Sequence, residues 1–248
     1  MIVPPSSLSG LLHRLAVWLI LMLDLNKRVY NHTPGPCRVV SGIKFFSISD
    51  VVVIGADRFF ISNLAYTSRG YLQTAELMMQ SSFGALYFFD GRTVTLQESG
   101  LSSPSALAID RRRQLIFVGS MLNENIRVYK LEKDFSLTFR TQISLLSSPA
   151  GMHVDEETGD IWVALHPVLH QAFFVTLYPT DERIRSPSQV LRVRIQEDGV
   201  SWVITEPYAN DGATISASNA VIYDKEHLVI GSMFSRLLHC DVLNPSIT

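Results

Sequence analysis

The chain is patterned as short runs in which apolar and β-branched residues flank a polar turn. The clearest run is Val154–Pro167 (VDEETGDIWVALHP), where a turn rich in Asp, Glu and Gly separates two apolar segments. This pattern predicts a β-hairpin. The same unit recurs at Ala106–Gly119, at Ala220–Gly231 and, with a weaker pattern, at Val51–Ser62. Four copies of one supersecondary unit predict a repeat architecture.

The density of strand signals after Cys37 is typical of sandwiches, barrels and propellers. With four strands per unit, the predicted strands form four propeller blades. The segment Tyr71–Phe83 departs from this pattern and predicts an amphipathic helix over one end of the β structure. Its apolar side chains either pack on their own domain or meet a membrane or a hydrophobic ligand. The predicted strands are Asp50–Gly55, Arg58–Ser62, Ala85–Phe89, Thr93–Gln97, Ala106–Ile109, Gln114–Gly119, Asn125–Leu131, Ser136–Ile143, Gly151–Asp155, Asp160–Leu165, Ala172–Leu177, Gln189–Ile195, Ser201–Thr205, Asn219–Tyr223, His227–Ser232 and Leu237–Val242.

The N-terminal part contains the apolar run Leu15–Leu23. The run is shorter than the roughly 20 residues that span a bilayer, but it suits the core of a signal peptide. No small-residue cleavage pattern follows, so it predicts an uncleaved signal anchor or a removed signal peptide, with a buried core helix as the alternative. We therefore divide the chain into a signal peptide or signal anchor at 1–28, a stalk and N-terminal strand at 29–48, and a β-propeller region at 49–248.

Two further features suit the secretory pathway. Asn31 begins the tripeptide Asn-His-Thr, an N-glycosylation sequon. The two cysteines, Cys37 and Cys240, lie near opposite ends of the sequence. Their separation is not that of zinc ligands, and in a secreted chain an even pair favours a disulfide, which would stabilise the fold by ~5 kcal/mol. We expect a lumenal or extracellular propeller at the endoplasmic reticulum or plasma membrane, held there by the N-terminal segment, or a secreted protein.

The charge gives no electrostatic case for a nucleic-acid partner, and we expect none. The net charge is −2 and only 18% of the residues are charged. The basic run Arg111–Arg113 lies in a predicted hairpin turn, without the aromatic platform on which bases stack. The sequence also lacks a zinc-protease helix motif, a phosphate-binding loop and a dinucleotide fingerprint. Ser81, Ser82 and Ser105 lack the glycine context of a serine hydrolase.

Five segments carry a resemblance to a known family. They are VDEETGDIWVALHP at Val154–Pro167, YLQTAE at Tyr71–Glu76, ENIRVYKLEKDFSLT at Glu124–Thr138, HLVIGSMFSRLLHCDV at His227–Val242 and PCRVVSGI at Pro36–Ile43. In these segments the chain resembles the paraoxonase/arylesterase family. The similarity covers nearly everything from Asp50 to Val242, and Pro36–Ile43 is a separate, shorter match. The resemblance implies a six-bladed β-propeller with calcium in its tunnel. It also implies hydrolysis of aryl esters, lactones and some organophosphates, a disulfide between the two end cysteines, and an N-terminal anchor that is often retained.

The sequence departs from the family at the join Ile43–Ser49, which passes directly over a long family segment. At roughly 40–50 residues per blade, about two of the six blades are missing. The resemblance places the first-blade calcium ligands and the catalytic histidine pair in that stretch. We expect an all-β fold, a partial six-bladed β-propeller with about four blades and an N-terminal hydrophobic anchor helix. Splicing, an incomplete gene model and a real deletion remain alternatives.

The remaining family ligand positions are also changed. Ser49-Asp50 replaces Asn-Asp, Ser105 replaces a tunnel asparagine, and Ala150-Gly151 replaces Asp-Asn. The segment Asn63–Thr67 replaces Asn-Asp-His-Tyr-Phe. Calcium takes about six to eight oxygen ligands. We therefore predict that Asp50 is a remnant metal ligand and that calcium binding is weak or absent.

His166 matches a histidine at the active-site end of the family fold. It is either a catalytic general base or a structural histidine at a strand end. Two functions follow from the resemblance. The first is a calcium-dependent aryl ester or lactone hydrolase that has become catalytically degenerate. The second is a non-catalytic, membrane-anchored chaperone or assembly factor for membrane proteins such as degenerin-type channels.

Overall fold

A computed structural model describes residues 38–40, 43–45, 47–67, 71–79, 81–181, 183–196, 201–233 and 236–242. The chain divides into two compact units, Met1–Phe46 and Ser47–Thr248. In the first unit, β1 (Arg38–Val40) and β2 (Ile43–Phe45) form an antiparallel pair. The sequence analysis placed one N-terminal strand within 29–48 without giving its bounds, and both strands lie in that range.

Several sequence predictions fall outside the described residues and stay predictions. They concern the apolar segment Leu15–Leu23, the sequon at Asn31 and the cysteine Cys37. Within the described part of the chain, no helix combines the length and the apolar character needed to cross a bilayer.

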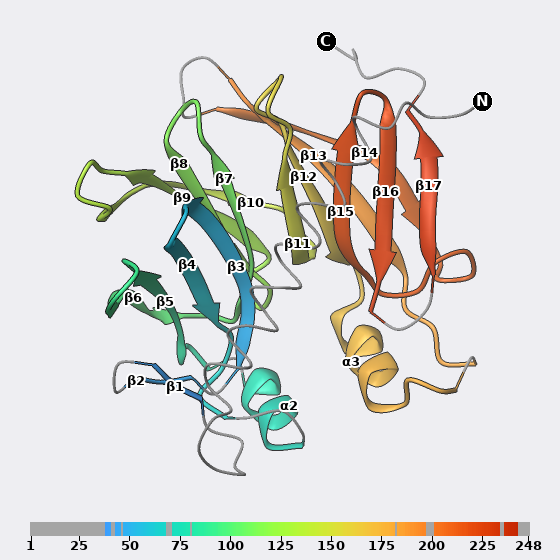
Figure 1. Cartoon of the computed structure of the whole chain (residues 1–248). Coiled ribbons are helices and arrows are strands. Elements are labelled where there is room, and N and C mark those ends of the chain that lie inside the picture. Colours follow the sequence, from blue (N-terminus) through green and yellow to red (C-terminus); the bar gives the residue numbers. More distant parts are fainter. Residues whose placement is uncertain are drawn as a thin grey trace. The chain divides into compact units, whose positions relative to one another are not determined.

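The second unit consists of antiparallel sheets in which consecutive strands are hydrogen-bonded neighbours (Figure 1). Blade 1 is β3-β4-β5-β6, blade 2 is β7-β8-β9-β10, blade 3 is β11-β12-β13-β14 and blade 4 is β15-β16-β17. The strands are β3 (Ile48–Gly55), β4 (Arg58–Asn63), β5 (Gly84–Phe89), β6 (Val94–Leu101), β7 (Pro104–Asp110), β8 (Leu115–Ser120), β9 (Asn125–Leu131), β10 (Leu137–Ser144), β11 (Ser148–Val154), β12 (Ile161–His166), β13 (Ser188–Ile195), β14 (Trp202–Asn210), β15 (Ser218–Asp224), β16 (His227–Ser232) and β17 (Leu237–Asp241). This arrangement confirms an all-β fold with four propeller blades.

The blades pack face to face, with a hydrophobic core between each successive pair. Because side chains alternate between the two faces of a strand, one strand serves two cores. In β8, Ile116 and Val118 pack in the core shared with blade 1, whereas Phe117 packs in the core shared with blade 3. In β12, Val163 faces blade 2 and Trp162 faces blade 4. The near-continuous hydrophobic runs at the predicted hairpins therefore reflect strands that are buried on both faces.

The first strands of successive blades are neighbours in space: β3 contacts β7, β7 contacts β11, and β11 contacts β15. In blades 2 and 3 the side chain of an aspartate closes the tight turn between the first and second strands. Asp155 illustrates the turn: its carboxylate accepts hydrogen bonds from the backbone N–H of Glu157 at 3.1 Å and from the hydroxyl of Thr158 at 2.6 Å. Asp110 closes the equivalent turn of blade 2 by accepting from the N–H groups of Arg112 and Arg113.

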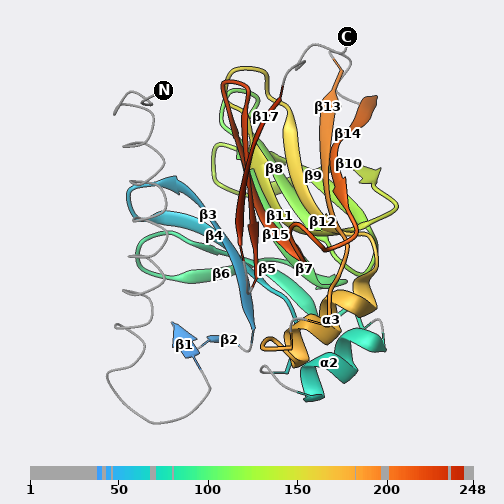
Figure 2. The ribbon, with the colours of Figure 1, turned by 90° about the vertical axis from the view of Figure 1, so that its right-hand side faces the viewer.

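Two short helices lie at the same end of the second unit (Figures 1 and 2). They are α2 (Tyr71–Met78), which confirms the predicted helix in a shorter form, and α3 (Leu169–Leu177). The predicted strand Ala172–Leu177 was wrong, because this segment belongs to α3. Its apolar run suits a strand or a helix, and here Ala172 and Val175, three residues apart, form the buried side of a helix.

Candidate functional site

A β-bulge recurs near the start of the first strand of every blade. In β3 the pairing with β4 skips Ser49, and in β7 the pairing with β8 skips Ser105. The residues skipped in β11 and β15 are Ala150 and Asn219. A bulge leaves its extra residue outside the ladder and re-aims its side chain, which is why bulges often lie beside binding sites. The structure thus places the family ligand positions Ser49, Ser105 and Ala150 at equivalent points of three blades.

Asn219 is the fourth member of this set, and the sequence analysis missed it as a candidate. The signal was present in the repeat itself, because Asn219 precedes the hairpin of blade 4 as Ser105 precedes that of blade 2. The four bulges together offer two hydroxyls, one methyl group and one carboxamide.

The two serine hydroxyls of this set connect neighbouring blades. Ser49 Oγ donates a hydrogen bond to the carbonyl oxygen of Ser105 at 2.9 Å, which links β3 to β7. Ser105 Oγ donates to the carbonyl oxygen of Pro149 at 2.5 Å, which links β7 to β11. Ala150 has no hydroxyl with which to continue the series. The serine side chains therefore act as links between first strands.

Asp50, which follows the first bulge, is also engaged with backbone groups. Its Oδ2 accepts a hydrogen bond from the N–H of Leu107 at 2.7 Å, and its Oδ1 accepts from the N–H of Val51 at 2.8 Å. Desolvation by burial raises the pKa of the Asp50 carboxyl group to about 6, although these two hydrogen bonds lower it. The carboxyl group thus joins blade 1 to blade 2 through the backbone of Leu107.

Gly151 occupies the equivalent place in blade 3, and the packing leaves no space for a side chain there. A Cβ atom at this position would lie 2.3 Å from the carbonyl oxygen of Asn219 and 3.2 Å from the Cα of Ala220. The close approach of β11 and β15 therefore depends on a glycine. A metal ligand at position 151 would require the two strands to move apart.

These residues do not fit the calcium ion that the family resemblance implies. Calcium binds several hard oxygens, and carboxylates supply the compensating charge. At the four bulges and the positions after them, Asp50 is the sole carboxylate, and both its oxygens accept backbone hydrogen bonds. Ser49 and Ser105 direct their hydroxyls to carbonyl groups, and Gly151 has no side chain.

His166 ends β12 and is buried, with 1% of its surface exposed. Desolvation lowers the pKa of its imidazole to about 4, so the ring is neutral at physiological pH. In the described part of the chain neither ring nitrogen has a hydrogen-bond partner, and the opposed Ser148 hydroxyl has none either. The hydrogen bonds of Asp50 go to Val51, Ser62 and Leu107, so they do not join Asp50 to His166.

Cys240 lies in β17, has no disulfide partner among the described residues, and packs, half-buried, in the core between blades 3 and 4. Burial raises the pKa of this thiol, and the charge of Asp241 raises it further. Because Cys37 lies outside the described residues, the Cys37–Cys240 disulfide stays a prediction.

The fold and the polar bulges at its first strands define the class of protein: a β-propeller in which each blade presents a polar or small residue at one equivalent point. A sequence profile of the Arylesterase family matches residues 44–242. The chain belongs to the arylesterase family. It is 47% identical to Mechanosensory abnormality protein 6 of Caenorhabditis elegans over 204 residues, which cover 82% of this chain and 54% of that protein.

More distant relatives agree with this assignment. Human Serum paraoxonase/arylesterase 1 is 25% identical over 198 residues, covering 79% of this chain and 54% of the human protein. The chain thus spans about half the length of the curated relatives that it matches. A gluconolactonase from Xanthomonas campestris has a similar fold, with a TM-score of 0.50 at 16% identity, covering 79% of this chain and 58% of that structure.

Proposed function

We propose that this chain is a non-hydrolytic member of the arylesterase family that acts by binding a membrane protein and promoting its assembly. The observation that carries the proposal is the state of the family ligand positions. Both carboxylate oxygens of Asp50 accept hydrogen bonds from backbone N–H groups, the Ser105 hydroxyl donates to a carbonyl oxygen, and Gly151 has no room for a side chain. A calcium-polarised ester carbonyl needs a metal site that these residues do not provide.

The sequence identities to the relatives also support a non-hydrolytic function. The relative with 47% identity is named for a mechanosensory abnormality, whereas the serum paraoxonases are 24–27% identical. Together with the expected N-terminal anchor, this favours a partner among membrane proteins, with degenerin-type channels as the proposed class. Anchoring in the endoplasmic reticulum or the plasma membrane places the propeller on the lumenal or extracellular side.

The second candidate is a calcium-dependent ester or lactone hydrolase, and His166 is the observation that favours it. Neither ring nitrogen of this buried imidazole has a hydrogen-bond partner among the described residues, which is unusual because buried polar atoms normally form hydrogen bonds. A substrate or a water molecule would satisfy the ring. With a pKa near 4, however, neutral His166 is a poor proton acceptor.

Calcium titration of the purified full-length chain separates these functions. We expect no heat of binding at micromolar calcium, no calcium-dependent rise in melting temperature and no hydrolysis of phenyl acetate. Human serum paraoxonase, treated identically, is the positive control for the assay. Tight calcium binding together with turnover that is lost in His166→Ala would overturn the proposal in favour of the hydrolase.

Assembly activity is tested by co-expressing the full chain with a degenerin-type channel and measuring channel protein at the cell surface. We expect an increase that the Asp50→Asn and His166→Ala variants retain, because a binding function uses neither group. An increase that disappears in both variants would tie the effect to the hydrolase residues. No increase with the wild-type chain would refute the proposed partner class.

A further inference from the structure

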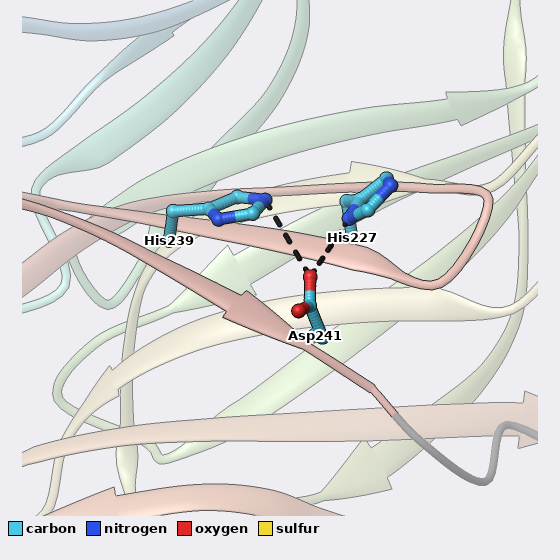
Figure 3. A group of neighbouring side chains, drawn as sticks. All are labelled: His227, His239 and Asp241. Carbon is cyan, nitrogen blue, oxygen red and sulfur yellow. Dashed lines mark hydrogen bonds and ion pairs between the residues drawn. The ribbon is translucent and has the colours of Figure 1, made fainter. Parts of the chain in front are cut away.

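Three metal-ligating side chains converge on the face of blade 4 that points away from blade 3. His227 begins β16, and it pairs across the ladder with Asp241 of β17. His239 lies two residues before Asp241 on the same strand, so the three side chains project from one face. Figure 3 shows both imidazole rings directed toward the Asp241 carboxylate.

The distances between the ligand atoms are short. Asp241 Oδ1 lies 3.0 Å from His227 Nδ1 and 3.9 Å from His239 Nε2. One ligand atom from each residue can be chosen so that all three lie within 4.8 Å of one another. In a tetrahedral zinc site with bond lengths near 2.1 Å, neighbouring ligand atoms are separated by about 3.4 Å. The two distances from Asp241 Oδ1 lie on either side of this value, so small rotations of the exposed side chains complete the geometry.

The other face of the same strands has a different role. Leu228 of β16 and the β17 residues Leu238 and Cys240 pack in the core between blades 3 and 4. Alternation along the strand therefore sends Cys240 inward and its neighbours His239 and Asp241 outward. The thiol is excluded from the cluster, whose ligands are two imidazoles and one carboxylate.

We propose that His227, His239 and Asp241 form a surface binding site for a zinc ion. Two histidines and a carboxylate are a donor set that zinc accepts, whereas calcium takes oxygen ligands and does not favour imidazole. The side chains are 55%, 57% and 63% exposed, so an ion reaches them without any opening of the fold. Three protein ligands leave a fourth position for water or for a donor from a bound partner.

This site is separate from the family calcium positions. It lies on β16 and β17, the second and third strands of blade 4, whereas the bulges lie on the first strand of each blade. Its occupancy therefore does not depend on the proposed loss of hydrolase function, and the two ideas fail independently.

The test is zinc binding to the purified full chain, measured by isothermal titration and by the visible absorption of cobalt(II) as a spectroscopic substitute. We expect one ion per chain and a cobalt spectrum of a four-coordinate site. His227→Ala, His239→Ala and Asp241→Asn should each weaken zinc binding by at least about tenfold, because each removes one of three ligands. His170→Ala, which removes an exposed imidazole on α3, is the matched control and should bind zinc as the wild type does.

Because all three ligands are exposed, the variants should keep the wild-type circular dichroism spectrum and melting temperature in the absence of zinc. An excess of calcium should not displace the ion. Absence of zinc binding by the wild-type chain, or equal binding by wild type, His227→Ala and His239→Ala, would overturn the proposal.

Discussion

Replacing Gly151 by alanine tests how closely blades 3 and 4 approach each other. The new Cβ atom would lie 2.3 Å from the Asn219 carbonyl oxygen, whereas a relaxed carbon–oxygen contact is about 3.3 Å. One of the two strands must therefore retreat by about 1 Å. Because both contacting groups belong to the backbone, a side-chain rotation cannot relieve the clash.

The retreat of β15 would loosen the core between the two blades, in which Trp162, Val221 and Ile230 are buried. Overpacking of this kind costs about 1–3 kcal/mol, and a backbone clash lies at the upper end. For a unit of this size, a loss of about 3 kcal/mol lowers the melting temperature by roughly 6–12 °C. Thermal unfolding followed by circular dichroism measures this shift.

Gly231→Ala is the matched control. Gly231 lies in β16 of blade 4, and its added Cβ atom would meet the Ala220 Cβ at 3.4 Å, an ordinary contact. We expect its free energy of unfolding to stay within about 0.5 kcal/mol of the wild type. Gly151→Asn should be as unstable as Gly151→Ala and should gain no calcium protection. Equal stability of Gly151→Ala and Gly231→Ala would refute the close approach of the two blades.

Three further predictions concern polar groups between strands. Ser105→Ala removes the hydroxyl that reaches Pro149 and should lower the free energy of unfolding in urea by about 1–2 kcal/mol, with unchanged stability contradicting the link. The pKa of the Asp50 carboxyl group is raised from 3.8 to about 6, so folding favours its protonated form and stability falls as the pH rises. Between pH 4 and pH 7 the free energy of unfolding of the wild type should fall by up to about 3 kcal/mol more than that of Asp50→Asn. Parallel urea curves for the two proteins would contradict the burial of this carboxyl group. Asp160→Asn leaves Arg192 and Arg194 without their shared, buried carboxylate and should cost about 3 kcal/mol in the same assay, whereas a neutral result would show that the pairs contribute nothing.

The blade hairpins could be predicted from sequence because their determinants are local. At Val154–Pro167 the turn is closed by Asp155 through Glu157 and Thr158, all within four residues. The segment Ala172–Leu177 was mispredicted because its aromatic and β-branched residues suit both a strand and a helix, and only tertiary packing separates the two. The local sequence pattern thus sufficed to predict the strands of the repeat but not the inserted helix α3.

The candidate sites depend on strand register, and the sequence does not tell which residue of one strand lies opposite which residue of the next. The spacing of His239 and Asp241 indicates a shared strand face, but His227 joins them only through the pairing of β16 with β17. Asn219 likewise becomes comparable with Ser49 and Ser105 only once the bulges are located. A family comparison identified the changed ligand positions without revealing what the new side chains contact.

Those contacts explain how the first strands remain joined where the resemblance implies a shared metal ion. Ser49 links blade 1 to blade 2 by a hydrogen bond to Ser105, and Ser105 links blade 2 to blade 3 by its bond to Pro149. Each bond is worth only about 1 kcal/mol net, but it also satisfies a carbonyl group of the neighbouring strand. Gly151 extends the series differently, since it lets the backbones of blades 3 and 4 meet directly. Restoring asparagine at position 105 alone would therefore remove a link between blades without rebuilding a metal site. Both oxygens of Asp50 would still be hydrogen-bonded to backbone N–H groups, and Gly151 would still have no side chain to bind a metal ion.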